Sequence, residues 1–318
     1  FSNICNDFVP FYQIDSFSRT PYGGNPAAVL LIPPAVKIDE GMMTTIAEEN
    51  NLSETCFVAT RAGGGNDSFK HDSSFDLRWF TPTNEVALCG HGTLAAARSI
   101  FEVGNQHESL IFHTLSGELV ASRSDDGNEI SLDFPLNVPR VVESEDSDYQ
   151  MIRDLADFVL QLTEGACSLE IIRLAHCKTT KKLIVHTRSI DDSVSNLEAL
   201  ESLRVPSPDL VLKFHSGTVV TGVTILVGGH GTPYDFCSRY FSPWNGIPED
   251  PVNGSSHTVL APYWINAELG GKHAILKARQ VSPRGGDLRL DASFENKRVS
   301  MSGPASISIT GSMVLPNI

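Results

Sequence analysis

Two short segments of similar sequence combine glycine with small polar residues at the expected start of a helix. They are Cys89-Gly90-His91-Gly92-Thr93 and Asn253-Gly254-Ser255-Ser256-His257, and each runs on into small and apolar residues. A helix start carries unpaired backbone N–H groups and partial positive charge, so it binds anions such as a carboxylate. Glycine lets the backbone approach such a ligand closely. We predict that the donors to a small carboxylate substrate come from Gly90, His91, Gly92, Gly254, Ser255 and Ser256.

The alternative is that both segments are only helix caps with turn glycines. Their recurrence in a longer internal repeat favours the functional interpretation. Arg78–Asn84 (RWFTPTN) matches Arg239–Asn245 (RYFSPWN) at an offset of 161 residues, close to half of the 318-residue chain. Two further matches follow in order at a slowly drifting offset. A repeat this long exceeds any solenoid period and predicts two similar lobes.

The elements that must position these residues are short strands and one apolar helix in each half. The helix after Gly90 has almost no polar face over residues 91–99, which is typical of a buried helix. We therefore predict an α+β fold with two pseudo-symmetric lobes, each a barrel-like sheet around a central apolar helix. The lobes are expected at 1–138 and 139–318, joined by a linker at 135–149, with the last strand a candidate to cross back. The two helix starts are expected to face each other across a cleft.

Composition narrows the class of protein. Hydrophobic residues make up 41% and charged residues 19%, which is ordinary for a globular chain. The net charge of −14 disfavours nucleic acids and anionic membranes as partners. Six scattered cysteines lack CxxC or zinc-finger spacing, which favours reduced thiols in a cytoplasmic protein without a bound metal. No apolar run long enough for a membrane helix and no signal peptide is seen, although a leader before Phe1 stays open.

An ordered set of motifs covers essentially the whole chain. The motifs are Asp15-Ser16-Phe17, Gly24-Asn25-Pro26-Ala27-Ala28-Val29, Asn51-Leu52-Ser53-Glu54-Thr55, Phe80-Thr81-Pro82-x-Asn84-Glu85, Gly90-His91-x-Thr93, Glu249-Asp250-Pro251-x-x-Gly254-Ser255 and Arg284-Gly285-Gly286. Together they resemble the PhzF family of phenazine-biosynthesis-like isomerases. The resemblance implies the diaminopimelate epimerase fold, no cofactor, and a homodimer.

Glu54 is the residue to which the resemblance gives the central role, that of an acid/base moving a proton on a small carboxylic acid. Leu52 and Phe57 flank it in the sequence, so we expect burial to raise its pKa toward the range useful for proton transfer. The alternative is a solvated surface glutamate.

The resemblance also assigns assisting roles. Asp250 would orient the substrate or hold a proton, and His91 would position the substrate or assist proton transfer. Asn25, Gly90, Gly92, Gly254 and Ser255 would bind the substrate. The alternatives are a turn aspartate before Pro251 for Asp250 and a structural histidine at a helix start for His91.

Cys89 offers a different mechanism, because epimerases of this fold use two cysteines, one before each central helix. A helix start is expected to lower the pKa of its thiol. Its counterpart in the second copy is Asn253, which cannot exchange a proton in that role, so a two-thiol mechanism is disfavoured. The alternative is a small buried apolar residue.

The leading hypothesis is a cofactor-independent isomerase that uses Glu54, and the rivals are a non-catalytic binding protein of the same fold and a Cys89-based epimerase. The chain departs from the family pattern at Asn253, Ser256 and Gly92, where threonine, alanine, and proline or alanine are usual. We therefore do not carry over the substrate of the phenazine pathway.

Overall fold

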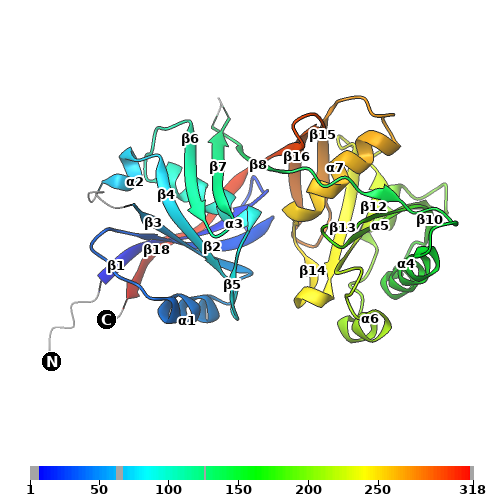
Figure 1. Ribbon diagram of the computed structural model, residues 1–318, viewed down its shortest axis with the longest axis horizontal. Helices are drawn as coiled ribbons and strands as arrows, with labels where there is room; N and C mark the ends of the chain where they lie inside the picture. Colours follow the sequence, from blue (N-terminus) through cyan, green and yellow to red (C-terminus); the bar gives the residue numbers. More distant parts are fainter. Residues whose placement is uncertain (1–6, 62–66, 125–126, 316–318) are drawn as a thin grey trace. The chain divides into compact units, whose positions relative to one another are not determined.

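The computed structural model describes residues 7–61, 67–124 and 127–315. The chain forms two compact units (Figure 1). Unit 1 comprises residues 1–133 and 302–318, and unit 2 comprises residues 134–301. Strand β8 (Ile130–Pro135) carries the chain out of unit 1, and β17 (Arg298–Gly303) carries it back.

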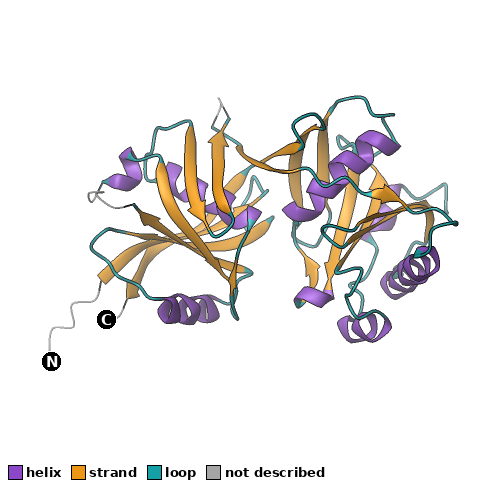
Figure 2. Cartoon of the chain, in the orientation of Figure 1, coloured by secondary structure: helices purple, strands orange, loops and turns teal. Residues whose placement is uncertain are grey.

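Unit 1 is a curved sheet with three helices (Figure 2). Its other strands are β1 (Asp7–Ser16), β2 (Asn25–Ile32), β3 (Glu54–Thr60), β4 (Ser74–Phe80), β5 (Glu85–Val86), β6 (Ser109–Thr114), β7 (Gly117–Arg123) and β18 (Ala305–Leu315). Its helices are α1 (Glu40–Asn50), α2 (Ser68–His71) and α3 (Gly90–Glu102).

Unit 2 contains a similar set of elements. Its strands are β9 (Arg140–Val141), β10 (Leu169–Cys177), β11 (Lys182–Ser189), β12 (Gly222–Gly228), β13 (Phe236–Ser242), β14 (Ile247–Asp250), β15 (Ile275–Gln280) and β16 (Gly286–Ser293), followed by β17. Its helices are α4 (Tyr149–Thr163), α5 (Asn196–Glu201), α6 (Pro208–Phe214) and α7 (Gly254–Ala267), with a 3-10 turn at Pro243–Asn245.

The predicted repeat is visible in the strand pairing of the two units. In unit 1, β1 and β2 are antiparallel, β2 and β3 parallel, β3 and β4 antiparallel, β4 and β6 parallel, and β6 and β7 antiparallel. In unit 2 the same order of relations links β10, β11, β12, β13, β15 and β16. A parallel pair needs a crossover connection. The β4–β6 crossover contains α3, and the β13–β15 crossover contains α7.

Each central helix is buried as its apolar sequence requires. The side chains of α3 that are fully buried are Leu94, Ala95, Ala96, Ala97 and Ile100. In α7 the residues from Ser256 to Ile265 are all buried. Small residues in α3 allow strands β1, β2 and β3 to pack closely against it. The predicted α+β fold with a central helix in each lobe is therefore confirmed.

The outer helices cover the opposite faces of the sheets. In α1, Met43, Ile46 and Ala47 form one hydrophobic cluster with residues of β2 and β3. Both ends of α1 are capped: the Asp39 side chain accepts a hydrogen bond from the Met42 N–H, and Asn51 ends the helix in a left-handed conformation.

Several elements differ from the sequence prediction. The expected linker at 135–149 contributes β9, which pairs with β10. Helix α5 follows β11 and begins with a capping box formed by Ser195 and Glu198. Strand β10 and helix α6 were not predicted. Helix α6 begins at Pro208. Proline breaks a helix in its interior but is favoured at its first position, so this proline does not exclude a helix.

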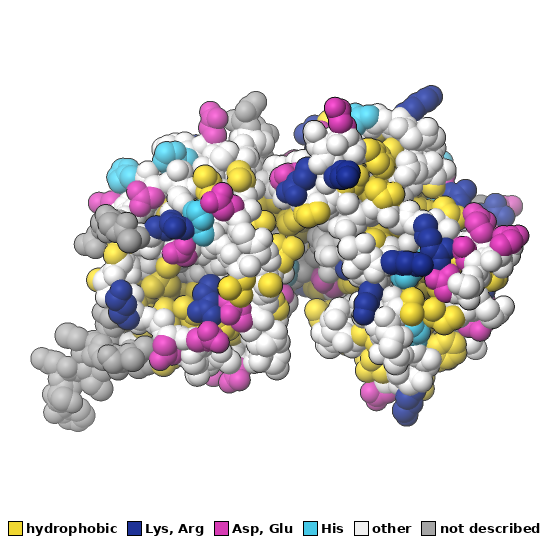
Figure 3. All heavy atoms as spheres, in the orientation of Figure 1, with side chains coloured by type: hydrophobic (Ala, Val, Ile, Leu, Met, Phe, Trp, Pro, Cys, Tyr) yellow, Lys and Arg dark blue, Asp and Glu magenta, His cyan; other side chains and the backbone are white. Residues whose placement is uncertain are grey.

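The surface carries both signs of charge. On the face shown in Figure 3, acidic and basic side chains are interspersed over both units. Among the described residues, no helix is long and apolar enough to cross a membrane. The five described cysteines are free thiols, and Cys5 lies outside the described residues.

Truncating the central helix should destabilise unit 1. Leu94→Ala removes a fully buried side chain, so we expect the free energy of unfolding of unit 1 to fall by about 2–5 kcal/mol. Leu115→Ala is the matched control, because Leu115 is 67% exposed and its truncation should change stability by less than about 0.5 kcal/mol. Urea denaturation followed by circular dichroism measures both. Equal losses in the two variants would contradict the assignment of α3 as the core helix.

Candidate functional site

Glu54 is the first residue of β3, and its backbone position is fixed by neighbours on both sides. It pairs with Ala27 of β2, and the next residue of β3 pairs with Phe80 of β4. The main chain of the central strands is therefore rigid at the point where the carboxylate projects. The side chain is 13% exposed, so the solvated surface glutamate considered from the sequence is wrong.

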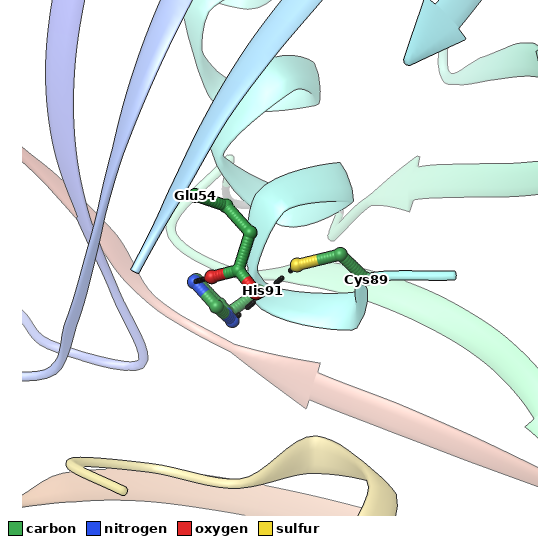
Figure 4. A group of neighbouring side chains, drawn as sticks. All are labelled: Glu54, Cys89 and His91. Carbon is green, nitrogen blue, oxygen red and sulfur yellow. Dashed lines mark hydrogen bonds and ion pairs between the residues drawn. The ribbon is translucent and has the colours of Figure 1, made fainter. Parts of the chain in front are cut away.

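His91 is the second residue of α3, and its ring lies against the Glu54 carboxylate (Figure 4). The His91 Nε2 atom is 2.9 Å from Glu54 Oε2, and the His91 side chain is 11% exposed. Helix α3 begins at Gly90, so the start of the helix places the imidazole beside the first residue of β3. The structure thus brings together two residues that lie 37 positions apart in the sequence. The family motifs assigned both of them a role in proton transfer.

The imidazole contacts other polar groups at both nitrogens. Ser53 Oγ is 3.2 Å from Nε2 and also donates a hydrogen bond to the Pro26 carbonyl. On the other side of the ring, Cys89 Sγ is 3.5 Å from Nδ1. The Ser16 hydroxyl donates to the His91 carbonyl at 2.8 Å. These contacts fix both the ring and the helix start to which it belongs.

The charges of the pair follow from this geometry. Burial raises the pKa of Glu54, but the charge of His91 and the polar groups of His91, Ser53 and Cys89 beside the carboxylate outweigh this effect, so the pKa lies below its usual value. Burial lowers the pKa of His91, but Cys89 and Glu54 raise it well above its usual value. The expectation of a raised Glu54 pKa is therefore wrong. The flanking residues in the sequence indicated that Glu54 is buried, but they did not indicate that the charge of His91 lies beside it. The resting pair is a carboxylate and an imidazolium.

Cys89 caps α3, with its sulfur accepting a hydrogen bond from the Gly92 N–H at 3.3 Å. Burial and the nearby Glu54 charge raise the pKa of Cys89 to about 12. The expected lowering of this pKa by the helix start is therefore wrong: a fully desolvated thiol beside a carboxylate holds its proton. The predicted alternative, a small buried residue, describes its packing.

Gly92 has no room for a side chain. A Cβ atom at this position would lie 2.8 Å from Trp79 Cδ1, 2.9 Å from Cys89 Sγ and 3.0 Å from Cys56 Sγ. The Gly92 N–H donates its hydrogen bond to the Cys89 sulfur. It is therefore not a free donor for the substrate, the role predicted for Gly92. Gly90 and His91 keep backbone N–H groups without an acceptor among the described residues.

Asn25 lies beside the pair and is 1% exposed. Its Oδ1 atom is 3.3 Å from Ser53 Oγ, the hydroxyl that contacts His91. The family resemblance predicted that Asn25 binds the substrate. In the structure its side chain contacts Ser53, and Ser53 in turn contacts His91. Ser53 and Ser16 were missed as site residues. The sequence contained a signal for each of them. Ser53 directly precedes Glu54, and Ser16 belongs to the first family motif.

The remaining predicted residues lie in unit 2. Asp250 ends β14 and is 8% exposed. Its carboxylate accepts hydrogen bonds from the Val252 N–H at 3.1 Å and the Asn253 side-chain amide at 2.8 Å. Asn253 in turn caps α7 by accepting from the Ser256 N–H. The turn role considered for Asp250 is thus present in the structure, and the N–H groups of Gly254 and Ser255 stand at the start of α7.

The Glu54, Cys89 and His91 side chains also have oxygen, sulfur and nitrogen atoms within 4.8 Å of one another, close enough to hold one metal ion. A metal needs a thiolate and a free imidazole lone pair. The high pKa of the Cys89 thiol and the protonated His91 ring oppose both. The group is best described as an acid/base cluster.

Comparison with known proteins identifies the family of this chain. The family described as phenazine biosynthesis-like protein matches residues 14–311. A phenazine biosynthesis-like domain-containing protein of Rattus norvegicus is 41% identical over 308 residues, covering 95% of this chain and 98% of that protein. An uncharacterized isomerase of Pseudomonas aeruginosa is 36% identical over 302 residues, covering 95% and 97%.

Solved structures resemble the whole chain. A PhzF-family phenazine biosynthesis protein of Enterococcus faecalis has a TM-score of 0.75 and 31% identity, covering 97% of this chain and 100% of that one. A protein of Pseudomonas aeruginosa described as a predicted epimerase has a TM-score of 0.62 and 17% identity, covering 96% and 99%, and it supports the fold alone.

Replacing Glu54 by glutamine should reveal the ion pair through pH. We expect the pKa of His91 to fall in Glu54→Gln, because a buried imidazolium loses its opposite charge. Proton NMR titration of the imidazole measures this change. A His91 pKa equal in both proteins would contradict the ion pair.

The same variant should lose stability in a defined pH window. The contribution of Glu54 is present above its ordinary pKa of 4.5 and is lost as pH falls through its lowered folded value. The contribution of His91 is present below 6.5 and is lost as pH rises through its raised folded value. The loss, about 3–5 kcal/mol, should therefore be largest between pH 4.5 and 6.5. Denaturant midpoints that differ equally at all pH values would contradict this prediction.

Proposed function

The chain belongs to the phenazine biosynthesis-like protein family, and we propose that it is an isomerase that moves a proton on a small carboxylic acid. In this proposal Glu54 is the acid/base, and the reaction needs no cofactor. The observation that carries it is the buried contact of 2.9 Å between Glu54 and His91 at the start of α3. An isomerase among the relatives supports the reaction class.

Glu54 begins the reaction as a base, since its lowered pKa keeps it ionised at neutral pH. The carboxylate takes a proton from a carbon conjugated with the carboxyl group of the substrate. The C–H electron pair enters the conjugated system, and the protonated Glu54 then returns the proton to another carbon of the same molecule. Nothing is oxidised or reduced, so atoms and electrons balance without another reactant.

His91 supports this cycle electrostatically. Its imidazolium holds Glu54 ionised before proton abstraction and, once Glu54 is protonated, faces the negative charge that has moved to the substrate. A charge fixed in a buried site stabilises such an intermediate without reorganisation. The free N–H groups of Gly90 and His91 are available donors for a substrate carboxylate. The parts of Asp250, Gly254 and Ser255 in the reaction rest on the family motifs.

The two rival functions make different demands on the site. A Cys89-based epimerase needs a thiolate at one stage, and the pKa of about 12 for Cys89 opposes it. A protein that only binds a ligand has no need of a buried carboxylate such as Glu54, whose charge is maintained although burial disfavours it. Retaining both charges in a buried pair costs desolvation free energy, which a catalytic use of Glu54 explains.

Hydrogen–deuterium exchange at carbon tests the proposal. We would incubate the protein in deuterated water with a panel of small cyclic and amino carboxylic acids, and follow their carbon-bound hydrogens by NMR. We expect deuterium on carbon with the unmodified protein and a loss of at least about 10²-fold in the rate with Glu54→Gln, because general acid/base catalysis contributes that much. Exposed Glu48→Gln, on α1, is the matched control and should exchange normally.

Exchange that survives in Glu54→Gln would remove Glu54 from the mechanism. If that residual activity were lost on alkylation of Cys89, the epimerase would replace our proposal. Thermal stabilisation by a member of the panel, without exchange at any carbon, would favour the binding protein.

A further inference from the structure

A pocket of about 380 Å³ lies in unit 1, toward the opposite end of α3 from the Glu54–His91 pair. His91 is the second residue of α3, whereas Arg98 and Phe101, which line the pocket, belong to the last two turns of the helix. A helix rises 1.5 Å per residue, so about 10–15 Å of helix separate these residues from His91. The pocket is therefore distinct from the site of the proposed proton transfer.

Segments that are distant in the sequence meet at this pocket. Arg19 comes from the connection between β1 and β2, Arg123 ends β7, and Ile130 begins β8. Arg123 and Ile130 are direct cross-strand neighbours in the antiparallel pair of β7 and β8 (Figure 1). Pro304 follows β17, where the chain has returned to unit 1. All of these residues belong to unit 1.

The pocket is basic although the protein is acidic. The chain carries 38 aspartates and glutamates against 24 lysines and arginines. Of the described residues that line the pocket, three are arginines and none is acidic. Guanidinium groups that share one hollow repel each other, and an anion between them removes that repulsion. A hollow lined by one sign of charge also concentrates the electric field and attracts ligands of the opposite charge.

Two of the three guanidinium groups are held in place by carboxylates. Arg19 Nη2 is 2.7 Å from Glu129 Oε1, and Arg98 Nη1 is 2.8 Å from Glu102 Oε2. The Arg98 Nε–H group also donates to the Ala305 carbonyl at 3.3 Å. Arg19 stands at the rim, because its side chain is 61% exposed. These contacts orient each guanidinium and use only some of its N–H donors, so donors remain for a ligand.

Arg123 is the guanidinium without a carboxylate partner. It lies over the Phe101 ring, 5.2 Å from the centroid, and donates to the Gln106 carbonyl at 2.8 Å. It forms no ion pair with any residue that the structure describes. The three arginines and the two glutamates that bind them therefore leave one positive charge in excess at the pocket.

The wall of the pocket is not uniformly charged. Phe101, Ile130 and Pro304 add apolar surface beside the guanidinium groups. The volume falls in the range of pockets that hold small organic molecules, roughly 300–1,000 Å³. A free inorganic ion would contact the guanidinium groups and leave the apolar surface uncovered. The combination fits a ligand with an anionic head and an apolar body.

The number of guanidinium groups favours phosphate as the anionic head. A phosphate monoester presents three strong acceptor oxygens and carries nearly two negative charges at neutral pH. A carboxylate presents two oxygens and one charge. The planar fork of arginine matches the oxygens of a phosphate group. Three arginines around one hollow therefore suit a phosphate better than a carboxylate.

We propose that this pocket binds a small organic phosphate. Arg98 and Arg123 hold the phosphate group, Arg19 contacts it from the rim, and the organic part lies against the apolar residues of the pocket. The inference goes beyond the proposed function, because this site uses none of the residues assigned to proton transfer.

Phenyl phosphate is the probe, with inorganic phosphate, benzoate and phenol as comparisons. We would titrate the full chain by calorimetry at constant ionic strength. We expect saturable binding of phenyl phosphate, binding at least about tenfold weaker for inorganic phosphate and for benzoate, and none of phenol. Absence of saturable phenyl phosphate binding would overturn the proposal. Equal affinity for inorganic phosphate would overturn the organic ligand, and equal affinity for benzoate would overturn the preference for phosphate.

Substitution of Arg123 tests the assignment of the pocket. Arg123→Gln should weaken phenyl phosphate binding by about tenfold or more, because it removes a charge-assisted donor and the excess positive charge. Arg123→Lys keeps the charge and loses the planar fork, so its affinity should lie between the two. Arg188→Gln is the matched control, because Arg188 belongs to unit 2 and is 63% exposed. Equal affinity in Arg123→Gln and wild type would overturn the proposal.

A measurement on the unmodified protein covers the case in which a variant does not fold. Phenylglyoxal modifies accessible guanidinium groups, and peptide mass spectrometry gives the rate of modification at each arginine. Saturating phenyl phosphate should slow the modification of Arg98 and Arg123 several-fold and leave that of Arg188 unchanged. Rates at Arg98 and Arg123 that do not respond to phenyl phosphate would overturn the proposal whatever the variants show.

Glu54→Gln separates this inference from the proposed function. The variant should bind phenyl phosphate with wild-type affinity, because Glu54 lies beside the start of α3 and the pocket lies toward its end. Binding that depends on Arg123, without carbon exchange on any substrate, would uphold the phosphate site and reject the isomerase. Exchange that depends on Glu54, with phenyl phosphate binding indifferent to Arg123, would do the reverse.

Discussion

The buried contact between Glu54 and His91 is the interaction on which the rest of unit 1 depends. Burying either charge alone would cost several kcal/mol, and each charge removes most of that cost for the other. The start of α3 adds an asymmetry, because its partial positive charge favours the carboxylate and disfavours the imidazolium. His91 is therefore protonated because Glu54 and the neighbouring thiol are present. The Ser53 hydroxyl, the Cys89 cap and the Gly92 backbone hold the pair in place.

The two units show how one scaffold can carry two different sets of side chains. The parallel strand pairs and the central helices recur, so both units present the end of a strand to the start of a helix. At that corner unit 1 has Glu54 and His91, whereas unit 2 has Gly222 and Ser255. Lys182 replaces Ala27 and reverses the charge. The same geometry therefore occurs twice, and a few side chains give each corner its own charge.

The sequence predicted what depends on repeats, caps and apolar runs. The apolar runs after Gly90 and Gly254 are the central helices of the two units. It could not predict what depends on contacts between distant segments. The pKa of Glu54 falls because a histidine 37 residues away faces it, and the pKa of Cys89 rises because the helix start that should lower it is buried beside a carboxylate. The register that matches Lys182 with Ala27 likewise needs the strand pairs.

The crowding around Gly92 has a consequence for the history of the chain. Trp79, Cys56 and the Cys89 sulfur leave no space there for one methyl group. A lineage that acquires a side chain at 92 must first, or at the same time, shrink one of these three neighbours. A side chain at position 92 is therefore compatible only with a different residue at position 56, 79 or 89.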